Sequence, residues 1–295
     1  MSQSTLSRVR PRTLFVISIC TVLVVVALVW NRAQRAATTI VVNSTSDVVN
    51  PSDGLCTLRE AITAANTNTA SGAVAGECAA GSSSVADTID LTGVTGTINL
   101  PAVLPDLNSD MTINGPGANQ LTIMRSTAAG TPNFRVFFIQ SAVNVSLVGL
   151  TISGGSPIGN GGGLINLGSL SLTNVTISGN SVTTASRGGG IFSNGGALTL
   201  TNSTVSGNKV INGGGGGGIE IIAGTATVTN STISGNTSAG SGAGIENFGV
   251  LVLANSTVSG NTADTSPSGN GGGIYAGGSS GSLTILDSTI RQPCR

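Results

Sequence analysis

The sequence predicts an all-β chain that winds into a parallel solenoid, in which short strands of successive coils stack on one another. A nine-residue phrase occurs four times, as LTNVTISGN, LTNSTVSGN, VTNSTISGN and LANSTVSGN, ending at Asn180, Asn208, Asn236 and Asn261. Apolar and polar residues alternate within the phrase, which is the period of a β-strand. Self-similarity at such a nearly constant step is typical of stacked repeats, each of which buries its apolar face against its neighbours.

Composition excludes several classes of function. The 295 residues carry no net charge, only 8% of them are charged, and histidine is absent. Without a basic surface the chain has no electrostatic footprint for nucleic acid, so we expect no such partner. The absence of histidine removes Ser-His-Asp and Cys-His nucleophile arrangements and imidazole metal sites.

Residues 1–37 are predicted to be an export segment. Three arginines precede a long apolar run from Leu14 to Trp30. A basic leader before such a run is typical of a signal peptide or a short membrane anchor, and both alternatives stay open because no A-x-A cleavage site follows it. We expect an exported protein, secreted or at the cell surface or outer membrane, that contacts a membrane only through this segment.

Residues 38–86 are predicted to cap the solenoid. The stretch LCTLREAITAAN has one apolar stripe at helical spacing, formed by Leu58, Ala61, Ile62 and Ala65. Thr57 and Glu60 have the spacing of a capping box, which begins a helix over 57–66. An amphipathic helix at the first coil would cover its apolar core and block edge-to-edge growth. Arg59 and Glu60 form a charged pair that a helix surface explains.

Cys56 and Cys78 are candidates for a disulfide. They enclose a short segment of the chain, and a disulfide would agree with export to an oxidising compartment. Two independent thiols are the alternative. Neither cysteine has a second ligand at C-x-x-C spacing, so we predict no metal site.

Residues 87–295 are predicted to form the coils. Each unit reads as a glycine turn, a short strand beginning GGGI, a strand such as LTLTN, and a third in STISGN. The inward positions of the second strand are Leu172, Leu200, Val228 and Leu253. Stretches from DTIDLTGVTGTINL onward show the same alternation with looser spacing. Because LTILDSTI begins a further coil that RQPCR ends, we expect the chain to be truncated at its C-terminus.

Asparagines at fixed positions of the repeat predict two ladders of side-chain hydrogen bonds between coils. The first comprises Asn174, Asn202, Asn230 and Asn255, and the second Asn180, Asn208, Asn236 and Asn261. Asparagine also tolerates the left-handed backbone of a sharp corner. The first set coincides with N-x-S/T sequons, so glycosylation is the alternative to a structural role.

The segment GLCTLREAITAAN, preceded by TTIVVNSTSD and followed by DTIDLTGVTGTINL, resembles the bacterial CSLREA domain, with Thr57 where the family name has Ser. The coils behind it resemble right-handed parallel β-helices of exported bacterial surface proteins, including polymorphic outer-membrane and adhesin-like repeats. The resemblance implies a right-handed parallel β-helix with a capping helix, displayed at the surface or secreted, without a set of catalytic residues to transfer.

Two acidic residues of the repeats are candidate site residues. Glu220 and Glu246 follow inward isoleucines, so both should point outward from neighbouring coils at a spacing of about 5 Å. Such a pair would raise one another's pKa or share a cation such as Ca²⁺. The equivalent positions of flanking coils hold Phe192 and Tyr275, and together the four could bind a sugar. We expect no lysine or arginine in register with the pair.

The sequence therefore predicts an exported, adhesin-like β-helix scaffold without catalytic residues, whose partner is a carbohydrate or another cell-surface component. The alternative is a polysaccharide lyase or glycoside hydrolase acting on polyuronides. Those chemistries require clustered carboxylates and a basic residue near the sugar acid. Solvated acids that keep the solenoid soluble are the simplest explanation of Glu220 and Glu246.

Overall fold

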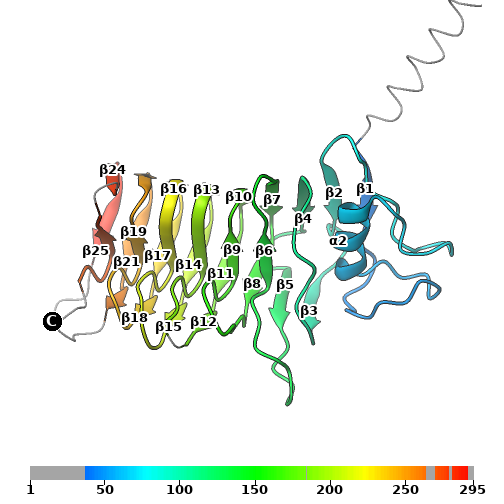
Figure 1. Cartoon of the computed structure of the whole chain (residues 1–295), viewed down its shortest axis with the longest axis horizontal. Helices are drawn as coiled ribbons and strands as arrows, with labels where there is room; N and C mark the ends of the chain where they lie inside the picture. The colour runs from blue at the N-terminus through cyan, green and yellow to red at the C-terminus, as the bar shows by residue number, and fades with distance from the viewer. Residues whose placement is uncertain (1–36, 184, 264–269, 279–280, 292–295) are drawn as a thin grey trace, which may run out of the picture.

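The computed structural model describes residues 37–183, 185–263, 270–278 and 281–291, which form an elongated stack of coils (Figure 1). Helix α2 (Leu58–Thr67) lies at one end, and strands β24 (Ser282–Leu286) and β25 (Thr289–Arg291) lie at the other. Residues 1–36 of the predicted export segment, including Leu14 to Trp30, lie outside the described residues. Within those residues, no helix combines the length and apolarity needed to cross a membrane.

The largest sheet, called sheet A here, has thirteen parallel strands in two columns. The first column consists of β1 (Thr39–Val41), β2 (Asp87–Asp90), β4 (Met111–Asn114), β7 (Asn144–Val148), β10 (Ser169–Thr173), β13 (Ile191–Thr201), β16 (Ile219–Thr229), β20 (Val250–Ala254) and β24. The second consists of β6 (Phe137–Ile139), β9 (Leu164–Asn166), the first residues of β13 and β16, β19 (Ile245–Asn247) and β23 (Ile274–Ala276). The long strands β13 and β16 therefore join the two columns.

Two further parallel sheets complete each coil. Sheet B consists of β3 (Gly96–Leu100), β5 (Leu121–Arg125), β8 (Thr151–Ser153), β11 (Thr176–Ser178), β14 (Thr204–Ser206), β17 (Thr232–Ser234), β21 (Thr257–Ser259) and β25. Sheet C consists of β12 (Ser181–Val182), β15 (Lys209–Val210), β18 (Thr237–Ser238) and β22 (Thr262–Ala263). A regular coil therefore has four extended segments instead of the predicted three, because two residues are too few to show an alternating pattern.

The predicted core positions stack directly above one another. Leu172 pairs with Leu200, Leu200 with Val228, and Val228 with Leu253, and all four side chains are fully buried. The all-β parallel solenoid predicted from the repeat is thus confirmed. Burial of these aliphatic columns supplies the main favourable term for folding in an otherwise polar chain.

Helix α2 covers the first coil through its apolar stripe. Thr57 is its N-cap, and Thr57 and Glu60 form the predicted capping box. Leu58 and Ile62 are fully buried, and the helix contacts β1 and β2. Arg59 does not pair with Glu60 as expected, because its guanidinium donates to Asp47 with an N–O distance of 2.6 Å.

A disulfide joins the segments directly before and after helix α2. Cys56 and Cys78 form a disulfide with a Cα–Cα distance of 4.7 Å, and both are buried. The bond closes the segment that contains α2, so it restricts the cap in the unfolded chain.

One of the two predicted asparagine ladders exists, and it is buried. The Nδ2 of Asn180 donates to Oδ1 of Asn208 at 3.0 Å, and the same contact continues through Asn236 to Asn261. The other prediction was wrong. The first set, Asn174, Asn202, Asn230 and Asn255, has left-handed backbones and exposed side chains.

A serine ladder replaces the missing one. After Asn202, Asn230 and Asn255 the next residue is a buried serine, whereas Val175 follows Asn174. The backbone N–H of Ser203 donates to Oγ of Ser231 at 3.0 Å. Ser256 continues the ladder by accepting from the Ser231 N–H at 3.1 Å. The regular coils are therefore held to one another at two corners, one lined by serine and one by asparagine.

Candidate functional site

The four candidate residues lie in register on adjacent strands of the second column of sheet A. Phe192 pairs with Glu220, Glu220 with Glu246, and Glu246 with Tyr275. Their side chains point away from the aliphatic core, as the alternation predicts. They are not in solvent, however, because Phe192 is 8%, Glu220 0% and Glu246 5% exposed, and only Tyr275 remains partly accessible.

A run of glycines covers the two carboxyl groups. The turn 213–218 before β16 has no side chains, and it lies against Glu220 and Glu246. A Cβ at Gly215 would collide with Oε2 of Glu246, and one at Gly216 would lie 2.6 Å from Oε2 of Glu220. Gly216 also has a φ of +67°, which favours glycine. The glycine turn therefore creates the space in which the acids are buried.

Arg187 pairs with both acids although it is not in register with them. Its Nη1 lies 3.0 Å from Oε1 of Glu220 and 3.2 Å from Oε2 of Glu246. Arg187 belongs to the turn before β13, so strand register does not place it beside the acids. Its guanidinium supplies a positive charge to the carboxyl pair. Among the described residues, no group of three or more Cys, Asp or Glu side chains is placed to hold a metal.

The carboxyl pair holds a proton. The pKa of Glu220 is raised to about 9, chiefly by burial and then by hydrogen bonding to and repulsion from Glu246, against the opposing effect of Arg187. Oε2 of Glu220 is buried without a donor. A proton on this carboxyl lets Glu220 donate to Glu246, so the neutral form meets the hydrogen-bonding requirement of the pair.

The accessible part of the site lies above the carboxyls. The Arg187 side chain is 40% exposed, and its guanidinium carbon lies 5.9 Å from the centre of the Phe248 ring. Phe248 and Tyr275 meet edge to face, with ring centres 6.1 Å apart. We call these three residues, Arg187, Phe248 and Tyr275, the aromatic patch. Phe248 directly follows β19, and neither periodicity nor charge distinguished it in the sequence.

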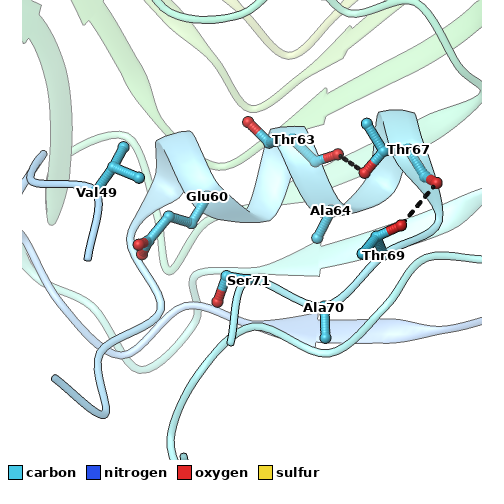
Figure 2. A pocket seen from close by; sticks show the side chains of 8 residues that line it. All are labelled: Val49, Glu60, Thr63, Ala64, Thr67, Thr69, Ala70 and Ser71. Carbon is cyan, nitrogen blue, oxygen red and sulfur yellow. Dashed lines mark hydrogen bonds between the residues drawn. The ribbon is translucent and has the colours of Figure 1, made fainter. Parts of the chain in front are cut away.

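A second candidate is a hollow of about 200 Å³ beside helix α2. Figure 2 shows the side chains that line it, those of Val49, Glu60, Thr63, Ala64, Thr67, Thr69, Ala70 and Ser71. Its polar groups already have partners: Glu60 accepts from the N–H groups of Asn50 and Thr57, and the Thr67 hydroxyl donates to the Thr63 carbonyl (Figure 2). The hollow is therefore a feature of the cap with little left to bind a polar ligand.

Comparison with known proteins identifies the family of the coils. A family model for a right-handed β-helix region matches residues 113–290, which is more than half of the chain. The matched range contains all four candidate residues and the aromatic patch. No curated protein and no solved structure matches the chain.

Proposed function

The chain belongs to the right-handed β-helix family, and we propose that it is an exported, non-catalytic scaffold that binds carbohydrate or another cell-surface component. The single observation that carries the proposal is the aromatic patch. It combines two aromatic rings with an accessible arginine that is held by two buried carboxyl groups. Folds of this kind host many functions, so the argument must come from the site itself.

The patch has the elements of a binding surface. Aromatic rings contribute large contact areas at low entropic cost, and arginine is enriched with them where proteins bind partners. Phe248 and Tyr275 are fixed edge to face, and Arg187 is held from below by Glu220 and Glu246. Because these groups are already positioned, little ordering entropy opposes binding.

Export is supported by three features. The predicted signal or anchor at residues 1–37 and the resemblance of residues 38–100 to the CSLREA domain come from the sequence. The Cys56–Cys78 disulfide adds a structural argument, because such bonds persist in oxidising compartments. A secreted or surface location follows as part of the proposal.

The burial of the two acids favours binding over catalysis. A general acid or base must come within hydrogen-bonding distance of the substrate. The carboxyl of Glu220 is covered by the glycine turn, and Glu246 is engaged by Arg187. A raised pKa such as that of Glu220 also occurs in catalytic acids, and this favours a polyuronide lyase or hydrolase as the second candidate.

The test is glycan binding by the full-length chain, with Phe248→Ala as the variant. We expect a loss of about tenfold in affinity, equivalent to about 1.4 kcal/mol. Phe138→Ala is the matched control, because Phe138 is also a partly exposed ring of this column with an arginine, Arg135, 5.5 Å from its centre. Equal affinity of both variants and parent would contradict the role of the patch.

Catalysis is tested on the same preparations. We expect no new reducing ends or unsaturated products from pectin or polygalacturonate, with or without Ca²⁺. Cleavage by the parent protein that is lost in Glu220→Gln would contradict the non-catalytic scaffold and support the lyase or hydrolase.

A further inference from the structure

Sheet B carries a regular array of hydroxyl groups on its outer face. Each of β11, β14, β17 and β21 has the pattern Thr-x-Ser, with a buried central residue and two partly exposed outer residues. The strands pair without a register shift, so like residues stack. One column comprises Thr176, Thr204, Thr232 and Thr257, and the other Ser178, Ser206, Ser234 and Ser259.

These hydroxyls are available to a ligand. Within the described part of the chain, none of them makes a hydrogen bond to the protein. One coil earlier the situation differs, because Oγ1 of Thr151 donates to the carbonyl of Ala118 at 2.6 Å. A hydroxyl can both donate and accept, so the four coils present a two-column array of free hydrogen-bonding groups.

The array is rigid because a buried ladder lies on each side of it. The serine ladder lies one residue before β14, β17 and β21, with Ser203 N–H donating to Ser231 at 3.0 Å. Before β11 the equivalent residue is Val175, whose N–H donates to Oγ of Ser203 at 3.1 Å. The asparagine ladder follows two residues after each strand, with Asn208 N–H donating to Asn236 at 2.9 Å. The positions of the hydroxyls are therefore set before any ligand arrives, which removes an ordering cost.

The geometry points to a crystalline ligand. Equivalent hydroxyls of successive coils are about 4.8 Å apart along the solenoid, and the two columns are roughly 7 Å apart along the strand. The first spacing is within a few tenths of an ångström of the oxygen repeat along the a axis of hexagonal ice. We propose that the outer face of sheet B binds ice, with its hydroxyls and threonine methyl groups ordering water in the repeat of the crystal.

Charge and side-chain type agree with this ligand. The two columns contain no charged and no aromatic side chain across the four coils, so they offer nothing to an anionic polymer or to a sugar ring. Water in a crystal is neutral and repeats in both directions of the array. Individually weak contacts then add along the columns, as in other multivalent binding. The proposal concerns a different face from the aromatic patch and does not depend on it.

The experiment measures incorporation of the labelled full-length chain into a slowly growing ice hemisphere, together with thermal hysteresis. The test variant is Thr204→Tyr with Thr232→Tyr, which puts two rings into the threonine column. The control is Thr199→Tyr with Thr227→Tyr, on the same two coils and also at outward positions, but in sheet A. Melting curves from circular dichroism confirm that both variants are folded.

We expect the parent and the sheet A variant to enter the ice and the sheet B variant to be excluded. Exclusion of the parent, or equal behaviour of the two variants, would overturn the proposal. An open hollow of about 690 Å³ over Thr151, Thr176 and Thr204 makes a neutral polysaccharide the rival ligand. Binding to cellulose or chitin that is lost only in the sheet B variant, without entry into ice, would decide for that rival.

Discussion

Replacing Glu220 with glutamine isolates the energetic effect of the buried proton. Glutamine has nearly the same shape, is neutral at every pH, and can donate an N–H to Glu246 where the acid donates its O–H. Because the pKa of Glu220 is raised to about 9, the parent carboxyl already carries a proton at pH 7. At mildly acidic pH we therefore expect the free energy of unfolding of Glu220→Gln to differ from that of the parent by no more than about 1 kcal/mol.

The difference should grow as the pH rises. An ordinary glutamate has a pKa of 4.5, so between pH 4.5 and about 9 the folded parent holds one proton that the unfolded chain has lost. Its stability is then greatest below the unfolded pKa and falls by about 1.4 kcal/mol per pH unit as the pH rises through this window. The variant lacks this dependence, so from pH 5 to pH 8 it should gain about 4 kcal/mol on the parent.

The measurement is guanidinium unfolding at several pH values between 5 and 9, followed by circular dichroism. Tryptophan fluorescence is a poor probe because the single tryptophan, Trp30, lies in the predicted export segment. Parallel stability curves for parent and Glu220→Gln across this range would refute the buried proton. A loss of more than about 3 kcal/mol in the variant at pH 5 would show that Glu220 binds Arg187 as an anion.

Three other variants test the packing. Arg187→Met should cost about 3–5 kcal/mol of unfolding free energy at pH 7, because it leaves the Glu246 carboxylate buried without its partner; an unchanged unfolding midpoint would contradict this. Cys56→Ser with Cys78→Ser opens the loop that the disulfide closes and should cost about 3 kcal/mol in the same assay. Ile62→Asp should uncover the first coil, so light scattering should show aggregation, and a variant as soluble as the parent would contradict the capping role of α2.

Periodicity was sufficient to predict the strands that carry it. The alternation around Leu200 and Val228 has one buried residue in two, and the constant step of the repeat places these positions above one another. The helix was equally predictable from the sequence, because its capping box and apolar stripe lie within one continuous stretch. The two-residue strands of sheet C are too short to show an alternating pattern. They form because the path of the chain between sheet B and the next coil places them side by side.

The two asparagine corners show that a regular repeat of one residue type does not determine whether its side chain is buried. Asn202 and Asn208 are equally regular in the sequence, yet one is exposed and the other fully buried. Asn202 itself occupies the left-handed region, with a φ of +50°, and turns its side chain outward. At the second corner Gly207 takes the left-handed position, with a φ of +61°, so Asn208 is free to point inward. The neighbouring glycine is the signal that distinguishes them.

The sequence predicted which candidate residues lie side by side on adjacent strands, but not that the two acids are buried and paired with an arginine. The groups that bury and pair them come from turns. Strand register locates Glu220 above Phe192, but the partner Arg187 reaches it from a turn, where no period applies. The run of glycines at 213–218 precedes the first of the two acids, and side chains at Gly215 and Gly216 would occupy the space of their carboxyls. In this chain, the glycine run directly before Glu220 is therefore the sequence feature that accompanies the buried carboxyls.

The buried cluster of Arg187, Glu220 and Glu246 lies where the length of the coil changes, and its location is consistent with a role in fixing strand register. Arg187, Glu220 and Glu246 come from three successive coils, and the coil that begins at Asn236 is shorter than the one before it. In the same place the long strand β16 is followed by two separate strands, β19 and β20. Aliphatic stacking tolerates a slipped register more readily than a buried ion pair does, because a slip would leave charges without partners. We therefore expect Arg187→Met to weaken the pairing of β16 with β19, which amide hydrogen exchange would detect as faster exchange in Ile245–Asn247 than in β14.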